Sequence, residues 1–303
     1  FVRPVHWIVL LFGADALPAT LLDTQAGNRT RGHRFHAPAP ITLGTPDDYA
    51  GALETGGKVI ASFAKRREMI RSGVEAKAKE MGGRAILSEA LLEEVTALVE
   101  WPVPVAGRFE ERFLELPREV LISTLQDHQR YFAVEDATGR LLTAFITVSN
   151  IESREPAQVR TGNERVVRPR LSDAAFFWQQ DRREPLAARL AGLDAVTFQA
   201  KLGSLGAKVK RVESISETIS ARLNWNVLQA QRSAALAKCD LLTAMVGEFP
   251  ELQGIMGSYY ATADGEPAVV AQAIREHYLP RGAGDALPQS APGTAVALAD
   301  RLD

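Results

Sequence analysis

The sequence predicts an α+β fold in which a mixed module of strands and helices is followed by an all-helical domain. β-rich apolar runs separated by turn residues mark several strands within the first 150 residues. Helical patterns interleave with these runs irregularly, which favours α+β over regular βαβ units. After Asn150 the strand signals fade and the pattern becomes nearly all helical. We therefore expect one domain at residues 1–180 and a second at residues 181–303.

The composition is typical of a soluble globular protein. The 303 residues leave room for about two domains, and 46% of them are hydrophobic and 24% charged. The net charge of −2 neither favours nor excludes a polyanionic partner, so local patches must decide that question. No apolar run is long enough to span a membrane. The single cysteine, Cys239, fits a reducing cytoplasm, and we expect it buried on a helix.

The first hundred residues are expected to start as β structure and to continue as helices. Residues 6–12, HWIVLLF, are typical of a buried strand. Thr45 is expected to cap a helix that has Pro46 at its first position. A basic helix follows between residues 57 and 83. The next amphipathic helix has an apolar face made of Leu91, Leu92, Val95, Leu98 and Val99.

The middle of the chain alternates between strands and helices. Residues 102–109, PVPVAGRF, predict a strand, and residues 116–128 predict a helix. Residues 129–150 contain two β-rich runs joined by a short turn with a glycine, which predicts a hairpin. The remainder is expected to be helical, with breaks near Pro185 and Gly192 and in the loop at residues 282–293.

The residue patterns argue against a metal centre and against nucleophilic catalysis. His33 and His36 are three apart, but Gly32 and nearby prolines favour extended backbone, on which alternate side chains face opposite ways. We therefore expect Arg34 and His36 on one face, and Arg31 and His33 on the other. The sequence contains no metal-binding motif, no nucleophile elbow and no phosphate loop.

Several arginine-rich segments point instead to phosphate. Residues 28–36, NRTRGHRFH, contain no acid, and residues 160–173 and 201–211 are also rich in cations. The stretch DHQRYF at residues 127–132 has the same mixture of cationic and aromatic side chains. Arginine forks match phosphate geometry, and aromatic rings stack on bases. Each segment alone is more typical of a solvated face with ion pairs, but several of them in one chain raise the case for an RNA surface.

Nine long blocks of the sequence resemble one family, the beta subunit of bacterial heterotetrameric glycyl-tRNA synthetase. They occur in the same order from end to end: FVRPVHWIVLLFG, AGNRTRGHRFHAP, EWPVPVAGRF, LPREVLISTLQDHQRYFAVED, FITVSNIES, GNERVVRPRLSDAAFFWQQD, FQAKLGSLGAK, MVGEFPELQGIMGSYYA and EHYLPRGAGDALP. Because that subunit extends beyond this chain on both sides, we expect an internal fragment.

The resemblance implies a division of labour between two subunits. The alpha subunit holds the aminoacylation site, so ATP and Mg²⁺ are used by the whole enzyme, and this fragment is expected to bind no cofactor or metal and to have no catalytic residue. Its implied partners are the alpha subunit and tRNA(Gly), in the cytoplasm and away from membranes. Charge and the matching blocks together give the expected tRNA-binding residues: Arg29, Arg31, His33, Arg34, His36, His128, Arg130, Arg165, Arg168 and Arg170.

The resemblance also implies the two modules: an editing-type domain, similar to the B3/B4 domain of the phenylalanyl-tRNA synthetase beta subunit, and then an HD-like helical domain truncated at its C-terminal end. Hydrolytic HD domains need a His-Asp pair, which this sequence lacks, although Asp300 resembles their distal aspartate. Asp240 and Glu248 lie where histidines are wanted, so a hydrolytic metal centre is not expected. Three alternatives stay open: an HD-type metal-dependent phosphohydrolase, a deacylase of mischarged tRNA, and a purely structural linking region.

Overall fold

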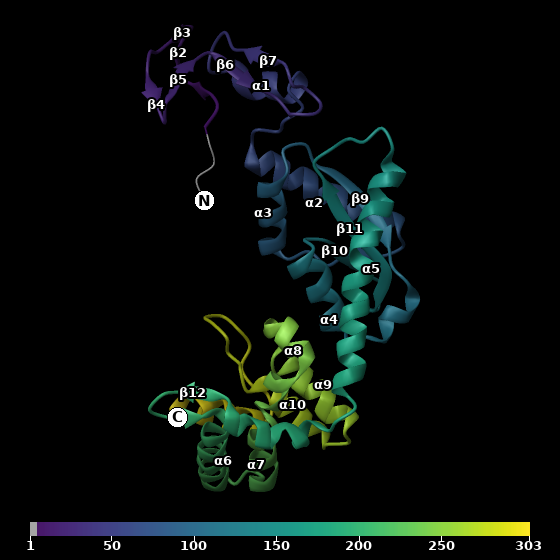
Figure 1. The fold of residues 1–303 in the computed structure, drawn as a ribbon, viewed down its shortest axis with the longest axis vertical. Coiled ribbons are helices and arrows are strands. Elements are labelled where there is room, and N and C mark those ends of the chain that lie inside the picture. Colours follow the sequence, from purple (N-terminus) through teal and green to yellow (C-terminus); the bar gives the residue numbers. More distant parts are fainter. Residues whose placement is uncertain (1–4) are drawn as a thin grey trace. The chain divides into compact units, whose positions relative to one another are not determined.

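The computed structural model describes residues 5–303 and confirms the mixed α+β class (Figure 1). The chain forms two compact units. The first contains the chain up to Leu114 together with Thr124–Pro169, and the second contains Glu115–Ser123 together with Arg170–Asp303. In sequence the units divide inside helix α5 (Pro156–Asp181), about ten residues before the limit expected at residue 180. The resemblance of the units to B3/B4 and HD-like domains stays a prediction.

The N-terminal β region consists of short ribbons rather than one buried strand. The run HWIVLLF divides into two strands of two residues each, and Trp7 and Phe12 are 43% and 77% exposed. The predicted buried strand is therefore wrong: sheets of two or three short strands are too small to cover both faces of such a run. The strands are β1 (Ile8–Val9), β2 (Leu11–Phe12), β3 (Asp15–Ala16), β4 (Thr20–Leu21), β5 (Thr24–Gly27), β6 (Arg29–Arg31) and β7 (Pro40–Thr42).

Three small sheets order these strands. One has the order β1-β5-β4, and the pairs β2-β3 and β6-β7 form the other two. Helix α1 (Asp48–Thr55) follows and begins later than predicted. Thr45 lies before it, and its backbone N–H and hydroxyl both donate to the Asp48 carboxylate, at 2.8 and 3.1 Å. The predicted capping residue thus holds the turn that leads into the helix.

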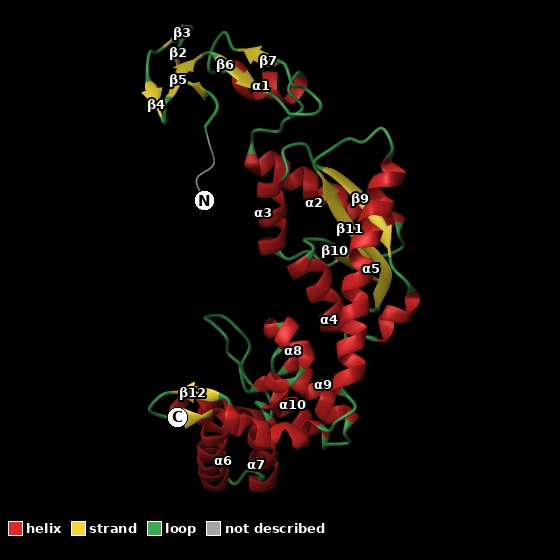
Figure 2. Cartoon of the chain, viewed as in Figure 1, coloured by secondary structure: helices red, strands yellow, loops and turns green. Residues whose placement is uncertain are grey.

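A four-stranded antiparallel sheet forms the centre of the first unit, in the order β8-β10-β11-β9 (Figure 2). Its strands are β8 (Arg84–Ala85), β9 (Val103–Arg108), β10 (Phe132–Glu135) and β11 (Leu141–Ser149). The predicted hairpin is confirmed, because β10 and β11 pair with each other. The predicted helices are α2 (Phe63–Glu80) and α3 (Glu89–Leu98), which the side chains of Ser62 and Ser88 cap.

Helices cover both faces of this sheet. Ile70 and Val74 of α2 pack with Val95 of α3 and with alternate residues of the sheet in one buried cluster. On the opposite face the Tyr131 ring stacks on Phe145, and its hydroxyl hydrogen-bonds the Asn163 side chain of α5 at 2.5 Å. Because successive strand residues point to opposite faces, β11 contributes to both layers.

The second unit is mainly helical, as predicted, and also contains a small hairpin. Its helices α6, α7, α10 and α11 pack on one another, and Val212, Ala234 and Val296 lie in a shared core. The α-helices are α4 (Arg118–Ser123), α6 (Leu205–Arg222), α7 (Val227–Leu236), α8 (Ala244–Glu248), α9 (Ile255–Ala263), α10 (Ala268–Glu276) and α11 (Ala291–Leu302). The hairpin strands are β12 (Thr197–Gln199) and β13 (Gly203–Ser204).

Several tighter or wider helical turns complete the chain. The 3-10 segments are η1 (Glu111–Glu115), η3 (Leu186–Ala195), η4 (Cys239–Leu242) and η5 (Pro250–Leu252), and η2 (Thr124–His128) is a π-helical turn. Cys239 is fully buried, as predicted, although its helix is of the 3-10 type. Burial raises the pKa of its thiol to about 12.

Candidate nucleic-acid interface

The arginine-rich stretch TRGHRFH contains a tight turn, which corrects the predicted extended backbone. Strand β6 ends at Arg31, and residues 34–36 turn back. The Nδ1 atom of the buried His33 accepts hydrogen bonds from the N–H groups of Phe35 and His36, at 3.2 and 3.3 Å. The rings of His33 and His36 lie 4.7 Å apart between centroids. The two histidines therefore lie together, not on opposite faces.

Both histidines stabilise this turn and its neighbours. The His33 N–H donates to the Gly57 carbonyl at 2.7 Å, and Nε2 of His36 accepts from the N–H of Glu152 at 3.0 Å. A Cβ at Gly32 would lie only 2.4 Å from the Gly57 carbonyl oxygen. The turn is thus held closely against the backbone of residue 57, and glycine is the residue that permits this approach.

The arginines of the same stretch remain open to solvent. Arg29, Arg31 and Arg34 are exposed, and none of the three has an ion pair among residues 5–303. The Arg31 guanidinium lies 5.9 Å from the centroid of the Trp7 ring. Three solvent-facing guanidinium groups on a closely held turn and its strand are suited to binding phosphate.

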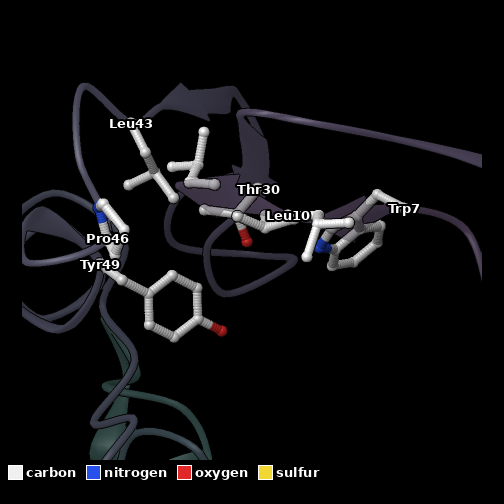
Figure 3. A pocket seen from close by; sticks show the side chains of 8 residues that line it. Trp7, Leu10, Thr30, Leu43, Pro46 and Tyr49 are labelled. Carbon is white, nitrogen blue, oxygen red and sulfur yellow. The ribbon is translucent and has the colours of Figure 1, made fainter. Parts of the chain in front are cut away.

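An aromatic hollow lies beside this strand and was not predicted from the sequence (Figure 3). Its volume is about 500 Å³, within the range of ligand pockets. Trp7 and Tyr49 stand at two ends of it, and both are about two-fifths exposed. The lining residues are Trp7, Val9, Leu10, Leu11, Thr30, Leu43, Pro46 and Tyr49. The sequence feature that could have indicated this hollow is the pair of aromatic residues, Trp7 and Tyr49, on either side of the acid-free stretch at residues 28–36.

His128 and Arg130 lie at the end of the π-helical turn η2. Both are half-buried, and Arg130 has a left-handed backbone with φ of 61°. Its Nε lies 2.5 Å from a carboxylate oxygen of Glu94, so this cation already has an anionic partner. Within the described chain, Arg130 forms its side-chain ion pair with Glu94 and none with residues 29–36.

The three predicted arginines of α5 are exposed but do not share one face. Arg165 and Arg168 are three residues apart and lie on neighbouring parts of the helix surface, whereas Arg170 points elsewhere. The Arg168 Nε lies 2.7 Å from a Glu110 carboxylate oxygen. Arg165 and Arg170 have no ion pair within the described chain.

Two cations of the segment at residues 201–211 pair with acids at the C-terminal end of the chain. Lys208 is buried, and its Nζ lies 3.2 Å from Asp300 Oδ1 and 3.1 Å from Asp303 Oδ2. Arg211 also pairs with Asp303. Lys208 and Arg211 therefore stabilise the C-terminal end of the chain at helix α11, whereas Lys201 and Lys210 remain exposed.

The carboxylate of Asp300, the residue that resembles a distal metal ligand, forms ion pairs with two lysines. Its Oδ2 lies 3.0 Å from Lys238 Nζ. Burial acts to raise the pKa of this carboxyl, but the Lys238 ammonium beside it holds the pKa below its usual range. Nearby, burial lowers the pKa of His277 to about 3, so that imidazole is neutral. Among residues 5–303 no group of three or more His, Cys, Asp or Glu side chains is placed to hold a metal ion.

No helix within residues 5–303 has the length and apolar character needed to cross a bilayer.

Comparison with known proteins gives one consistent result. The family model for the glycyl-tRNA synthetase beta subunit matches residues 1–303. The glycine–tRNA ligase beta subunit of Chromohalobacter salexigens is 56% identical over 303 residues. The same-named subunits of Marinobacter nauticus and Hahella chejuensis are each 54% identical, over 304 and 303 residues. These alignments cover 100% of this chain and 44% of each relative.

Proposed function

Because this chain belongs to the glycyl-tRNA synthetase beta-subunit family, we propose that it contributes tRNA binding and assembly to a glycine–tRNA ligase. The chain spans 44% of the length of the relatives it matches, so the proposal concerns one part of a larger protein. Its partners are an alpha subunit, which carries the ATP- and Mg²⁺-dependent chemistry, and tRNA(Gly). The compartment is the cytoplasm.

The observation that carries the tRNA role is the set of solvent-facing arginines at residues 29–34. Arg29, Arg31 and Arg34 have no carboxylate partner within the described chain, unlike Arg130 and Arg168. Unpaired guanidinium groups bind phosphate without first losing an intramolecular ion pair. His33 and His36 act on this surface indirectly, because both are engaged in holding the turn.

The experiment uses the full-length beta subunit assembled with its alpha subunit. We expect Arg31→Ala/Arg34→Ala to weaken binding of tRNA(Gly), measured by fluorescence anisotropy at 150 mM salt. The affinity of the unmodified assembly should fall steeply as salt rises, because neutralised phosphates release counterions. The double variant should show a shallower salt dependence, by a slope of about 1.5 for two lost phosphate contacts.

The matched control is Lys65→Ala/Arg140→Ala, which removes two cations that already pair with Glu54 and Asp136. This control has the same net charge as the test variant, and we expect it to bind tRNA like the unmodified assembly. Equal weakening by both double variants would contradict a specific surface at residues 29–34. Binding that does not change with salt would contradict tRNA binding through phosphate contacts altogether.

Nothing among the described residues favours the two hydrolytic alternatives. A metal-dependent phosphohydrolase needs Asp300 free to bind a cation, but two lysines neutralise it. A deacylase needs an activated nucleophile or a bound water near a general base. The only cysteine of the sequence, Cys239, is buried with a raised pKa. The purely structural alternative is tested by the same binding measurement, since it predicts no loss of tRNA affinity in the arginine variant.

A further inference from the structure

Building on the proposed tRNA binding, we infer that the hollow between Trp7 and Tyr49 holds one unstacked nucleobase of the bound tRNA. The inference rests on three features of the hollow: two exposed aromatic walls, a threonine hydroxyl that lines it, and a guanidinium beside one wall. All three lie within residues 7–49 of the first unit. Neither aromatic residue belongs to the set expected from the sequence.

The aromatic walls provide stacking surfaces. Trp7 is 43% exposed and Tyr49 is 41% exposed, although both are large rings that proteins usually cover. Apolar side chains of Leu10, Leu43 and Pro46 line the space between them (Figure 3). Every nucleobase has a π-face, and RNA-binding proteins place single unstacked bases on such rings.

Thr30 supplies a hydroxyl to the lining of the hollow. The residue is only 3% exposed and lines the hollow, and its hydroxyl is not among the buried polar atoms that lack a partner within residues 5–303, so the hydroxyl oxygen faces solvent in the hollow. A ligand that enters the hollow displaces water from this hydroxyl, so it binds well only if one of its own polar groups takes over the hydrogen bond. A base edge offers both donors and acceptors to a hydroxyl.

The charge at the rim matches a nucleotide and not an apolar peptide. Arg31 lies over the Trp7 ring, and Arg29 is on the same strand, two residues earlier. Strand alternation directs Thr30 toward the hollow and leaves its two arginine neighbours exposed, and the Arg31 guanidinium beside the Trp7 ring is placed to contact the phosphate of a base held there. A peptide side chain would fill the hollow without using either the hydroxyl or the guanidinium groups.

The test compares Trp7→Leu/Tyr49→Leu with Trp7→Phe/Tyr49→Phe in the full-length beta subunit assembled with its alpha subunit. Leucine keeps the walls apolar and removes stacking. We expect the leucine variant to bind tRNA(Gly) about 10-fold more weakly, with an unchanged salt slope, and the phenylalanine variant to bind normally. Thr30→Val should weaken binding about 5-fold. The control is Phe12→Leu, which alters an exposed ring of the same region that does not line the hollow.

These results separate the inference from the proposed function. If the arginine double variant loses affinity while the leucine variant binds normally, the tRNA role stands and the base pocket is wrong. A leucine variant that retains tRNA affinity but no longer co-elutes with the alpha subunit would assign the hollow to a protein contact, which also overturns the inference.

A second measurement is independent of whether the variants fold. The unmodified assembly is crosslinked by ultraviolet light to tRNA(Gly) carrying 4-thiouridine, and the adducts are mapped by mass spectrometry. We expect adducts on Trp7 or Tyr49, and their absence under conditions that give adducts elsewhere on the subunit would overturn the inference. Adenosine and guanosine monophosphates serve as competitors. A mononucleotide that binds the hollow more tightly than tRNA does would assign it to free nucleotides instead.

Discussion

The Lys238 ammonium lies 3.0 Å from Asp300 Oδ2 inside the helical unit, and both side chains are largely buried. Lys208 approaches the other oxygen of the same carboxylate at 3.2 Å. The Lys238 Nζ also lies 3.9 Å from the centroid of the Tyr278 ring. Two cations thus neutralise one buried acid. Asp300 of α11 thereby links Lys208 of α6 to Lys238, which follows α7.

Loss of one of these cations should be costly. We expect Lys238→Met to lower the free energy of unfolding by about 3 kcal/mol, because it leaves a buried carboxylate less compensated. Adding Asp300→Leu to Lys238→Met should recover most of that loss, since the uncompensated charge is then absent. Urea denaturation measures both effects. Lys201→Met, at an exposed lysine, is the control and should change stability by less than about 0.5 kcal/mol.

Asp240 should lower the free energy of unfolding as pH rises, whereas carboxylates with a lowered pKa raise it. Burial raises its pKa to about 6, although its Oδ2 accepts from the N–H groups of Gly254 and Gly257. The folded state therefore keeps a proton that the unfolded state releases above its ordinary pKa near 3.8. The stabilisation from this group is complete below that value and is lost as pH rises through 6.

Asp240→Asn isolates this effect, because the amide oxygen can still accept from the two glycines and carries no charge. We expect the difference in free energy of unfolding, unmodified protein minus Asp240→Asn, to fall by about 2 kcal/mol between pH 4 and pH 7. Urea denaturation across that range measures it. A difference that is constant with pH would show that Asp240 titrates normally.

Patterns within short segments predicted much of the fold, because their causes are local. Helix α3 follows from apolar residues at helical spacing, and α2 lies within the basic helix predicted between residues 57 and 83. The hairpin of β10 and β11 follows from alternation on either side of a glycine turn. The exposed ribbons at residues 8–21 were not predicted, because burial depends on whether another layer covers a strand, and local apolarity does not encode that.

The candidate site was less predictable, because its geometry depends on contacts between distant segments. The turn at residues 32–36 depends on Nδ1 of His33 as an acceptor and on close approach to Gly57. The hollow combines Trp7 with Tyr49, which are far apart in sequence. Lys208 belongs to a run of cations in the sequence, but its partner Asp300 lies at the other end of the helical unit, so the sequence alone does not show the ion pair. Arginines were predictable as exposed cations, but their pairing was not.

Gly32 should tolerate no side chain. We expect Gly32→Ala to lower the free energy of unfolding by about 1–3 kcal/mol, because the new Cβ meets the Gly57 backbone at 2.4 Å. The control is Gly51→Ala in helix α1, where a Cβ meets nothing within 4 Å. That control should be neutral or should stabilise by up to about 1 kcal/mol, because alanine favours helix. Equal stability of the two variants, measured by urea denaturation, would contradict the close approach.

Cys239 should be chemically silent in the folded protein. With a pKa of about 12, its thiol is about one part in ten thousand thiolate at pH 8, and the side chain is also fully buried. We expect Ellman's reagent to label Cys239 only after denaturant is added, with peptide mapping used to assign the site. Complete labelling of Cys239 within minutes under native conditions would contradict its burial.

The ion pair between Arg168 and Glu110 allows the α5 surface to be tested with a variant that should increase the affinity for tRNA. Arg168 shares a helix face with Arg165, and the pair with Glu110, at 2.7 Å, holds its guanidinium at the protein surface. We expect Glu110→Gln to strengthen tRNA(Gly) binding about twofold to threefold, because it frees one arginine and removes one repulsive charge. Glu54→Gln, which frees Lys65 in the same way, is the control for the change in net charge. If both variants strengthen binding equally, the gain reflects net charge alone, and Arg165 and Arg168 do not lie on the tRNA path.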